Sequence, residues 1–351
     1  MMKKPDPPIS YRSSGVDIDS MDEAIRGIRD LAASTFGPEV LAGVGGFGGI
    51  FRPALKGFED PVLVASADGV GTKIKVAARM GVYDSVGRDL VNHCVNDILC
   101  QGAVPLFFMD YVAVGKLEAA RIRELVAGVA EACRDAGCAL LGGETAEMPG
   151  LYAPGEFDLA GFIVGIADRK NLVDGSRIVP GDLLLGLPAS GMHTNGYSLA
   201  RKLFFELLDW NPQDRIDRLG RTLGEELLVP HRCYLTEVKP FLEKGWIRGI
   251  AHITGGGITD NLPRILPENC RAVVNRGSWP VLPVFSLIQE KGGVDPEEMY
   301  RAFNMGVGMI LVAEPETAAK IVDYLGNQGQ EVHSIGRIEA GSPGVEYREE
   351  R

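Results

Sequence analysis

The sequence predicts a protein of the α+β or α/β class that is built from two domains. The chain has 351 residues, of which 45% are hydrophobic, so it can bury a sizeable core and is expected to divide into two domains. Apolar runs of strand length alternate with helical patterns, most regularly in the second half. Several of these runs end in loops rich in glycine and acidic residues, which is where α/β proteins bind ligands.

The first half is expected to mix helices and strands. The capping-box sequence Ser20–Glu23 predicts the start of a helix, and residues 61–66 are typical of a buried strand that delivers Asp68 at its end. The other expected elements are a helix over residues 84–101, a strand over 104–114, a helix over 117–136, a strand over 138–141 that places Glu144 just past its end, and a strand over 157–167.

Residues 168–181 are polar and carry turn formers, so we expect the domain boundary there, with one domain over residues 1–170 and a second over 171–345. The second domain is expected to be an α/β layer. Its predicted elements are strands over residues 182–187, 249–254, 307–313 and 331–338, a helix that begins near Tyr197, and a helix over 315–326.

Composition argues against several classes of function. The net charge of −11 and the lack of a basic stripe argue against nucleic-acid binding. No apolar run reaches the roughly 18 residues needed to span a bilayer, and residues 1–10 lack the apolar core of a signal peptide. We therefore expect a cytoplasmic protein without membrane contact. The six cysteines show no CxxC spacing and are expected to be reduced structural thiols.

Three acidic clusters flanked by glycine carry most of the functional information. They are Asp68-Gly69-Val-Gly71-Thr72-Lys73, Asp97 with Gly102-Ala-Val-Pro105 behind it, and Gly142-Gly-Glu144-Thr145. Carboxylates bind hard cations such as Mg²⁺, and glycine lets backbone N–H groups approach phosphate oxygens. The set predicts a site for a Mg²⁺-nucleotide and phosphoryl chemistry. This requires the three clusters to converge, because each acid alone is also an ordinary turn or cap residue.

The helix expected over residues 84–101 places Asp89, His93, Asn96 and Asp97 along one face. A solvated face is the simpler explanation, but such faces normally carry lysine and glutamate, so ligand binding is favoured. Asp110 lies in the apolar run 106–112. A carboxylate there must be paired, bound to a metal or located at the rim of the sheet.

The glycine-rich segment 43–49 matches the pattern GxGxxG. That fingerprint requires a preceding strand, whereas a helix is expected before this segment, so a Rossmann site is not predicted. A Walker A sequence is also absent from the chain, which argues against a P-loop kinase. The part of the segment that contains Gly45, Gly46, Phe47 and Gly48 is expected either to cradle a phosphate or to form a flexible turn.

In the second half, His193 and Asn195 occupy a glycine-bounded loop just before a helix. Helix N-termini attract anions, so this loop is expected to hold substrate or phosphate, with a purely structural histidine as an equally good explanation. His252 is the next candidate for a functional histidine because it lies close to three consecutive glycines, and His231 and His333 are weaker candidates.

At these residues the chain resembles the phosphoribosylformylglycinamidine cyclo-ligases, also called aminoimidazole ribonucleotide synthetases, from Tyr11 to its last strand. The motifs that carry the resemblance are Gly15-Val-Asp-Ile-Asp19, Gly45-Gly-Phe-Gly48, Asp68-Gly-Val-Gly-Thr-Lys73, Asn96-Asp97 with Gly102-Ala-Val-Pro105, Gly142-Gly-Glu-Thr-Ala-Glu-Met-Pro149, His193-Thr-Asn-Gly-Tyr-Ser198 and Thr254-Gly-Gly-Gly257. Met192 stands where the family pattern has proline.

The resemblance implies a homodimer in which N-terminal strands of both subunits form a shared barrel, with ATP near that interface and a C-terminal α/β layer over the cleft. It also implies ATP-dependent ring closure of formylglycinamidine ribonucleotide to aminoimidazole ribonucleotide, a step of purine biosynthesis. The γ-phosphoryl group of ATP would activate the formamide oxygen. An amidine nitrogen of the same molecule would then attack the activated carbon and expel phosphate.

With this family in view, we expect Asp68, Asp97 and Glu144 to hold Mg²⁺, with Asp110 as a weaker candidate. Lys73 and Thr72 would contact the ATP phosphates. The nucleotide site would also include Gly69, Gly71 and Asp89, and it would lie beneath the segment Gly45–Gly48. His193 and Asn195, with Lys73, are the expected catalytic residues, because they would orient the substrate or the transferring phosphoryl group.

Two alternatives remain at this point. Another ATP-dependent member of the superfamily, similar to selenophosphate synthetase or thiamine-monophosphate kinase, would share the Asp-x4-Gly-Ala-x-Pro element. Selenophosphate synthetases usually carry a reactive cysteine or selenocysteine near the N-terminus, and this chain has no cysteine before Asp68. A non-catalytic nucleotide sensor would bind ATP without turnover, but it would not need all three acidic clusters together with Lys73.

Overall fold

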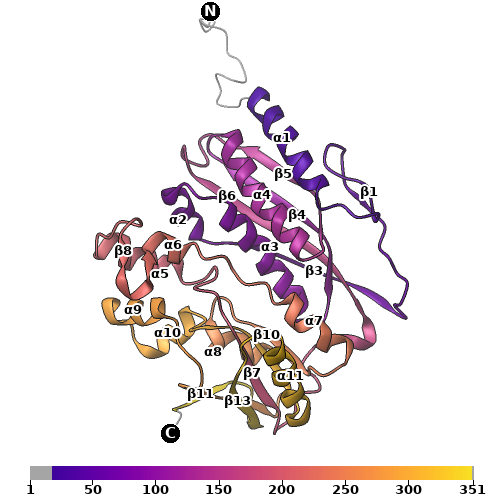
Figure 1. Ribbon diagram of the computed structural model, residues 1–351, viewed down its shortest axis with the longest axis vertical. Coiled ribbons are helices and arrows are strands. Elements are labelled where there is room, and N and C mark those ends of the chain that lie inside the picture. The colour runs from indigo at the N-terminus through magenta and orange to yellow at the C-terminus, as the bar shows by residue number, and fades with distance from the viewer. Residues whose placement is uncertain (1–17, 350–351) are drawn as a thin grey trace, which may run out of the picture.

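The computed structural model describes residues 18–349, with the side chains of residues 25–349. Two sheets form the centres of two halves of the molecule, and Figure 1 shows the first half, in indigo to magenta, above the second half, in orange to yellow. The halves meet along helix α3 (Asp84–Leu99), against which α7 (Leu235–Glu243) and β10 (Gly249–His252) of the second half pack. The motif residues Gly15 to Asp17 lie outside the described residues.

The sheet of the first half has four strands. The order is β3-β6-β4-β5, with β6 antiparallel to both of its neighbours and β4 parallel to β5. The strands are β3 (Pro61–Gly69), β4 (Val104–Val114), β5 (Ala139–Glu147) and β6 (Phe157–Asp168).

Helices cover one face of this sheet because their apolar residues recur on one side. In α3, Leu90, Cys94 and Ile98 follow the i, i+4 spacing and are buried in the same core as Phe108 of β4. Gly161 of β6 permits this close approach, since a Cβ atom there would clash with Phe108. The other elements of this half are α1 (Ile18–Ala33), α2 (Lys73–Met80), α4 (Ala119–Asp135), β1 (Val40–Ala42) and β2 (Ile50–Phe51).

The sheet of the second half has six strands in the order β10-β12-β7-β13-β11-β14. All neighbouring strands are antiparallel except β11 and β14, which are parallel. The second strand in this order, β12, is completely buried, which explains its continuous apolar run. The strands are β7 (Leu183–Pro188), β10, β11 (Cys270–Arg276), β12 (Val307–Ala313), β13 (His333–Ala340) and β14 (Val345–Glu349).

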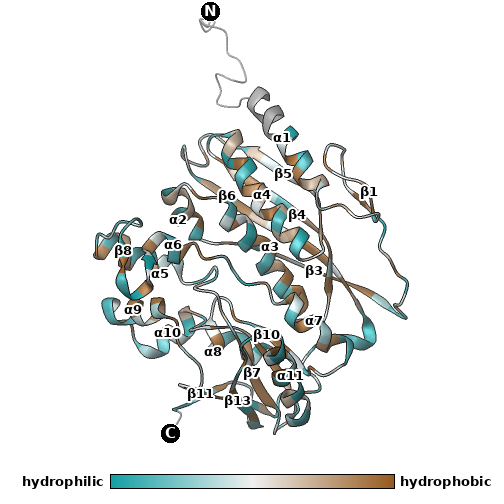
Figure 2. Cartoon of the chain, in the orientation of Figure 1, coloured by the Kyte–Doolittle hydropathy of each residue, from teal (hydrophilic) through white to brown (hydrophobic). Residues whose placement is uncertain are grey.

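Short helices surround this second sheet. Figure 2 shows that hydrophobic residues concentrate on the strands and on the inner sides of the helices. The remaining elements are α5 (Tyr197–Arg201), β8 (Arg215–Ile216), β9 (Arg221–Thr222), α6 (Leu223–Leu227), α8 (Gly257–Asn261), α9 (Pro283–Gly292), α10 (Pro296–Ala302) and α11 (Pro315–Asn327). Among the described helices, none is both long and apolar enough to cross a bilayer.

Most predicted elements agree with the structure, and two corrections affect the site. The predicted strand over 104–114 and helix over 84–101 are confirmed as β4 and α3. The strand predicted to end at Leu141 continues to Glu147, so Glu144 lies inside β5 and not past its end, because pairing with β4 extends the strand. The predicted helix start at Ser20 is also wrong, since α1 begins at Ile18.

The register of the first sheet places two predicted acids in one row. Asp68 of β3 and Asp110 of β4 both pair with Gly161 of β6, and Asp110 pairs with Gly143 of β5 on its other side. Adjacent strands lie about 4.8 Å apart, so the backbones of Asp68 and Asp110 are separated by roughly 10 Å. Asp68 lines one cavity of the molecule and Asp110 lines another, so this row of paired residues runs from one cavity to the other.

Candidate active site

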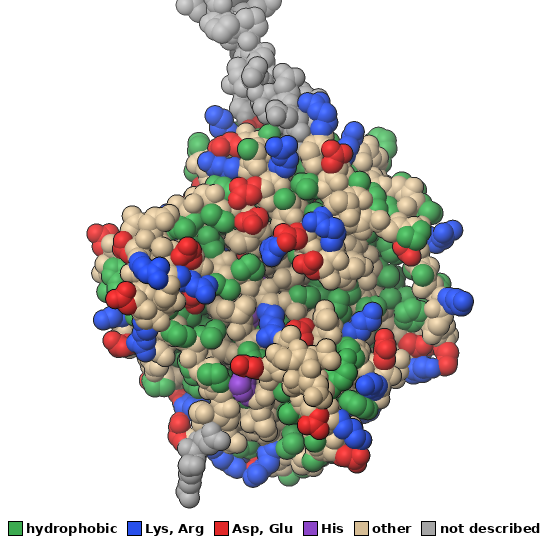
Figure 3. All heavy atoms as spheres, viewed as in Figure 1, with side chains coloured by type: hydrophobic (Ala, Val, Ile, Leu, Met, Phe, Trp, Pro, Cys, Tyr) green, Lys and Arg blue, Asp and Glu red, His purple; other side chains and the backbone are tan. Residues whose placement is uncertain are grey.

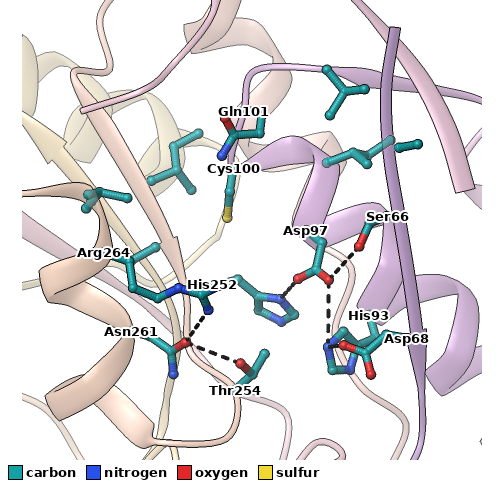
Figure 4. Close-up of a pocket in the computed structure, with 16 residues that line it drawn as sticks. Ser66, Asp68, His93, Asp97, Cys100, Gln101, His252, Thr254, Asn261 and Arg264 are labelled. Atoms are coloured by element: carbon teal, nitrogen blue, oxygen red, sulfur yellow. Dashed lines mark hydrogen bonds and ion pairs between the residues drawn. The ribbon is translucent and has the colours of Figure 1, made fainter. Parts of the chain in front are cut away.

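A cavity of about 460 Å³ lies between the two halves. The first half lines it with β3 and α3, and the second half lines it with β10 and the segment 254–265 that contains α8. Figure 4 shows the polar side chains that point into it: Ser66, Asp68, His93, Asp97, Gln101, His252, Thr254, Asn261 and Arg264. The cavity brings together Asp68 and Asp97, two of the predicted Mg²⁺ ligands from different clusters.

His93 lies between these two carboxylates. Its Nε2 is 2.9 Å from Asp68 Oδ2 and 4.0 Å from Asp97 Oδ2. The hydroxyl of Ser66 donates a hydrogen bond to Asp97 Oδ2 at 3.1 Å. The side chain of Asp68 is 43% exposed and that of Asp97 is 27% exposed, so both carboxylates remain accessible from the cavity.

Both carboxylates are held in the ionised form. Burial alone would raise the pKa of Asp68, but the hydrogen bond and charge of His93 outweigh it and lower the pKa. Burial acts on Asp97 in the same way, and there the hydrogen bond from His252 lowers the pKa. Burial would lower the pKa of His93, but Asp68 and Asp97 raise it above its ordinary value. The pair therefore presents negative charge to the cavity at neutral pH.

Residues of the second half complete this site. His252 Nδ1 is 2.8 Å from Asp97 Oδ1, and its Nε2 is 2.9 Å from Nε2 of His231. Thr194 Oγ1 is 3.0 Å from His93 Nδ1 and 3.4 Å from His231 Nδ1. A continuous chain of polar contacts thus runs from Asp97 through the second half and back to His93, which joins the two halves at the cavity.

Asp89 and Lys73 lie together in the interior, away from the cavity. Both side chains are 0% exposed, and Lys73 Nζ is 2.7 Å from Asp89 Oδ2. Nζ also donates to the backbone carbonyls of His193 at 3.1 Å and Val229 at 2.8 Å. Burial lowers the pKa of Lys73 and raises that of Asp89, and the charge of each partner opposes this effect. These contacts use all three donors of Lys73, so a phosphate could bind it only if one of them broke.

The glycines after Asp68 shape the start of α2. Gly71 has a φ of 57°, and Thr72 Oγ1 lies 3.2 Å from Ser198 Oγ of the second half. Gly69 N donates to the carboxylate of Asp68 at 2.7 Å. Thr72 is half-buried and its neighbour Lys73 is buried, so the hydroxyl of Thr72 is more accessible than the amine of Lys73.

A second cavity of about 410 Å³ contains the other predicted acids. It is lined by Gly45, Gly46, Asp110 and Glu144, together with Arg29 and the apolar side chains of Ile25, Ile28, Val44 and Leu140. Phe47 is fully exposed beside it and Gly48 is also exposed. Burial raises the pKa of Asp110 to about 7. The four predicted metal ligands therefore form two pairs, Asp68 with Asp97 and Asp110 with Glu144, one in each cavity.

The loop that contains His193 and Asn195 follows β7. His193 is completely buried, has a φ of 60°, and its ring stacks on that of His231 with centroids 3.9 Å apart. Asn195 is half-buried, and its Nδ2 lies 3.4 Å from Thr194 Oγ1. Met192, where the family pattern has proline, is buried in the core. The loop thus presents Asn195 toward the polar chain, while the His193 side chain faces the interior.

Four residues of the site could not be recognised, or were given little weight, from the sequence. His252 and His231 received weak claims because nothing in their spacing connects them to Asp97, which is 155 residues from His252 in the chain. Arg264 and Asn261 gave no signal, although Arg264 is the one lysine or arginine among the described residues that line the first cavity. The glycines at 255–257 were the available clue, since they mark the loop that these residues surround.

Comparison with protein families defines the class. The AIR synthase related protein family matches through its N-terminal domain over residues 53–167 and its C-terminal domain over residues 179–348. Solved structures agree at the level of fold. Thiamine-monophosphate kinase from Stenotrophomonas maltophilia superimposes with a TM-score of 0.66 at 17% identity, over 93% of this chain and 95% of that one. The hydrogenase maturation protein HypE in complex with ATP gives a TM-score of 0.63 at 20% identity, over 92% and 90%.

Individual relatives narrow the class further. The phosphoribosylformylglycinamidine cyclo-ligase of Alkaliphilus oremlandii is 50% identical over 337 residues, which are 96% of this chain and 99% of that protein. The cyclo-ligase of Brevibacillus brevis is 48% identical over 338 residues, 96% and 98% of the two chains. The protein belongs to the phosphoribosylformylglycinamidine cyclo-ligase family. The predicted family, enzyme class and function, aminoimidazole ribonucleotide synthesis in purine biosynthesis, are thereby confirmed, as is a two-domain α/β fold with mixed sheets.

Proposed function

We propose that ring closure of formylglycinamidine ribonucleotide takes place in the cavity between the two halves, with Asp68 and Asp97 as the ligands of Mg²⁺. The observation that carries this proposal is the placement of both carboxylates around His93 at a cavity large enough for a small substrate. The reaction proceeds by transfer of the γ-phosphoryl group to the formamide oxygen, which makes that oxygen a good leaving group. Attack by the amidine nitrogen is intramolecular, so positioning supplies much of the rate.

The residues of the cavity fit a hard cation. Mg²⁺ prefers carboxylate oxygens, and Asp68 and Asp97 are both ionised at neutral pH because their pKa values are lowered. Bound Mg²⁺ would neutralise charge on the phosphoryl oxygens. His252 fixes the orientation of Asp97 through the Nδ1–Oδ1 contact, and Ser66 holds the other oxygen of the same carboxylate.

The opposite side of the cavity suits the anionic substrate. Arg264 Nη1 donates to Asn261 Oδ1 at 3.2 Å, which holds the guanidinium group at the cavity wall. We assign it to the ribose 5′-phosphate, since guanidinium groups match phosphate geometry. Asn195 lies beside Gly255 of the neighbouring loop and is assigned to substrate orientation. His193 and Lys73 would act indirectly, since the carbonyl of His193 accepts from Lys73 and both are buried.

The nucleotide would extend toward the second cavity. Apolar side chains and the backbone of Gly45 and Gly46 suit an adenine base, and Arg29 supplies a positive charge. Thr72, Gly69 and Gly71 would contact the ATP phosphates, which would lie between the two cavities. Asp110 and Glu144 would then lie close to the nucleotide, and a cation beside them would favour the ionised form of Asp110.

A homodimer would cover the open face of the first sheet. Leu63, Met109 and Phe162 are 66%, 39% and 49% exposed, and Phe162 pairs directly with Met109. An apolar patch of this kind on a sheet marks an interface, so we propose that the shared barrel forms here. We also propose that the two domains cover residues 1–170 and 171–345.

Phe162→Asp tests this interface. In sedimentation experiments it should convert a dimer, of twice the 37.8 kDa chain mass, into a monomer. A variant that sediments like the wild type would contradict this interface.

The function is tested by measuring ADP and aminoimidazole ribonucleotide with MgATP, in the presence and absence of formylglycinamidine ribonucleotide. We expect ADP only with substrate, matched mole for mole by aminoimidazole ribonucleotide. Arg264→Gln should raise KM for the substrate more than it lowers kcat, since it would remove a binding contact remote from the reacting atoms. ATP binding without substrate-dependent ADP would contradict the proposal and point to a nucleotide sensor.

A further inference from the structure

Four of the five histidines of the chain lie together at the centre of the molecule. His93 belongs to the cavity with Asp68, but the group His193, His231 and His252 has a separate geometry. Each of these three side chains is buried and brings one ring nitrogen to within 4.8 Å of the others. We propose that His193, His231 and His252 form a binding site for one divalent d-block cation such as Zn²⁺, distinct from the proposed Mg²⁺ site.

The present contacts of the six ring nitrogens determine which of them can turn to an ion. His252 Nδ1 contacts Asp97 and His231 Nδ1 contacts Thr194, while their Nε2 atoms face each other at 2.9 Å. His193 Nε2 accepts from the backbone N–H of Ser190 at 3.3 Å, so the proton of this neutral ring lies on Nδ1, which is buried and has no hydrogen-bond partner among the described residues. Protein histidines that bind zinc usually engage a carboxylate or another oxygen through the second nitrogen, as His252 and His231 do here.

The proton positions allow binding without a change in net charge. In the metal-free site, His252 Nδ1–H donates to Asp97, so its Nε2 accepts, and His231 Nε2–H is the donor between the two rings. On binding, the His231 proton moves to Nδ1 and is donated to Thr194 Oγ1, which leaves the Nε2 lone pairs of both rings free for the ion. The His193 ring must turn out of its stack on His231, because stacked rings direct their lone pairs side by side. This turn moves the unprotonated Nε2 from the N–H of Ser190 to the ion and leaves the proton on Nδ1.

The chemistry of the site favours zinc-like ions over Mg²⁺. Three imidazole nitrogens suit Zn²⁺, Ni²⁺ or Co²⁺, whereas Mg²⁺ prefers oxygen. Burial keeps His193 and His231 neutral by lowering their pKa values, and neutral imidazole is the form that binds metal. His252 also lines the cavity of about 460 Å³, which provides a route for the ion and room for water as a fourth ligand.

The proposal is tested by titrating ZnCl₂ into chelator-treated protein in excess Mg²⁺ and measuring the heat of binding by calorimetry. We expect one Zn²⁺ per chain. His231→Gln should weaken binding by more than roughly 100-fold, and Thr194→Val, which removes the hydroxyl that contacts His231 and His93 but no ligand of the ion, by about tenfold. His333→Gln is the matched control, because His333 lies in β13 outside the cluster, and its affinity for Zn²⁺ should equal that of the wild type.

A second measurement keeps the test valid if His231→Gln does not fold. Wild-type protein with Co²⁺ in place of Zn²⁺ should show the visible bands of a four-coordinate site with nitrogen and oxygen ligands. A thiolate-to-cobalt charge-transfer band would assign the ion to a cysteine and overturn the proposal. The absence of stoichiometric Zn²⁺ binding, or equal affinity in His231→Gln and wild type, would overturn it as well. None of these results depends on turnover, so they are independent of the proposed reaction.

Discussion

Two of the aspartates of helix α3, Asp89 and Asp97, lie two turns apart on the same face, and their surroundings are opposite. Asp89 is completely buried against Lys73, and burial raises its pKa. Asp97 faces the cavity, remains partly exposed, and has a lowered pKa because His252 binds it. One end of the helix uses a carboxylate to join the two halves, since Asp89 Oδ1 accepts from the backbone N–H of His231 at 2.6 Å, and the other end presents a carboxylate to the cavity. Spacing along a helix cannot separate these roles; the groups that surround each carboxylate in the folded protein decide between them.

The largest expected effect is on stability at the Asp89 end. Lys73→Met should lower the free energy of unfolding by about 3–5 kcal/mol, because it leaves a buried carboxylate without its cation. Urea denaturation measures the change. Lys75→Met, in the same helix, is the control: Lys75 pairs with Glu156 at the surface, so its loss should cost less than about 1 kcal/mol. If the Lys73 variant is as stable as the Lys75 variant but inactive, Lys73 contacts phosphate as the sequence predicts.

At the other end of α3, the expected effect is on catalysis. Asp97→Asn should lower kcat by about 10²–10³-fold while the protein remains folded, since it removes a ligand of the ion that stabilises the transferring phosphoryl group. Substrate-dependent ADP release measures the change. Asp84→Asn, at the exposed start of the same helix, should retain wild-type turnover. Full activity in Asp97→Asn would refute the metal role of this residue.

The histidines beside Asp97 should make stability depend on pH. Burial holds the pKa of His231 below its ordinary value of 6.5, so the unfolded chain takes up its proton first as pH falls. The free energy of unfolding therefore contains the full contribution of neutral His231 above pH 6.5. Below that pH this contribution should decrease by up to about 1.4 kcal/mol per pH unit. Denaturation between pH 7.5 and about 5 should show a flatter profile for His231→Gln by this amount. Parallel profiles for variant and wild type would mean that His231 is not buried in its neutral form.

A smaller effect is expected from the hydroxyl that positions Asp97. Ser66→Ala removes one neutral hydrogen bond to Asp97 Oδ2, which is worth about 0.5–1.5 kcal/mol. We expect kcat/KM to fall by a few-fold to about tenfold. Comparison with Asp97→Asn would then distinguish the effect of losing the carboxylate from the effect of losing the hydrogen bond that positions it. An effect as large as that of Asp97→Asn would show that Ser66 contacts substrate directly.

Much of this organisation follows from local sequence. The strand over 104–114 and the helix over 84–101 were predictable because their apolar periodicities are strong. Glu144 was misplaced because β5 extends through pairing with β4, a contact that residues 138–141 alone cannot reveal. The acidic clusters around Asp68 and Asp97 were visible as motifs, since glycine and carboxylate stand next to each other in the chain.

The tertiary part of the site could not be predicted. His231 and His252 become neighbours of Asp97 only when the second half packs on α3, and no periodicity encodes that contact. The role of Lys73 was equally hidden, because a lysine after a glycine-rich cluster is typical of phosphate binding. Its burial against Asp89 depends on carbonyl groups 120 and 156 residues away.

The most direct test of this account is to locate the cation. Crystals of the protein with Mn²⁺ and a non-hydrolysable ATP analogue would reveal the ion by anomalous scattering. We predict an ion about 2.1 Å from a carboxylate oxygen of Asp97, with Asp68 as a second ligand. An ion bound only between Asp110 and Glu144, with no ion at Asp97, would contradict the assignment of catalysis to the cavity between the two halves.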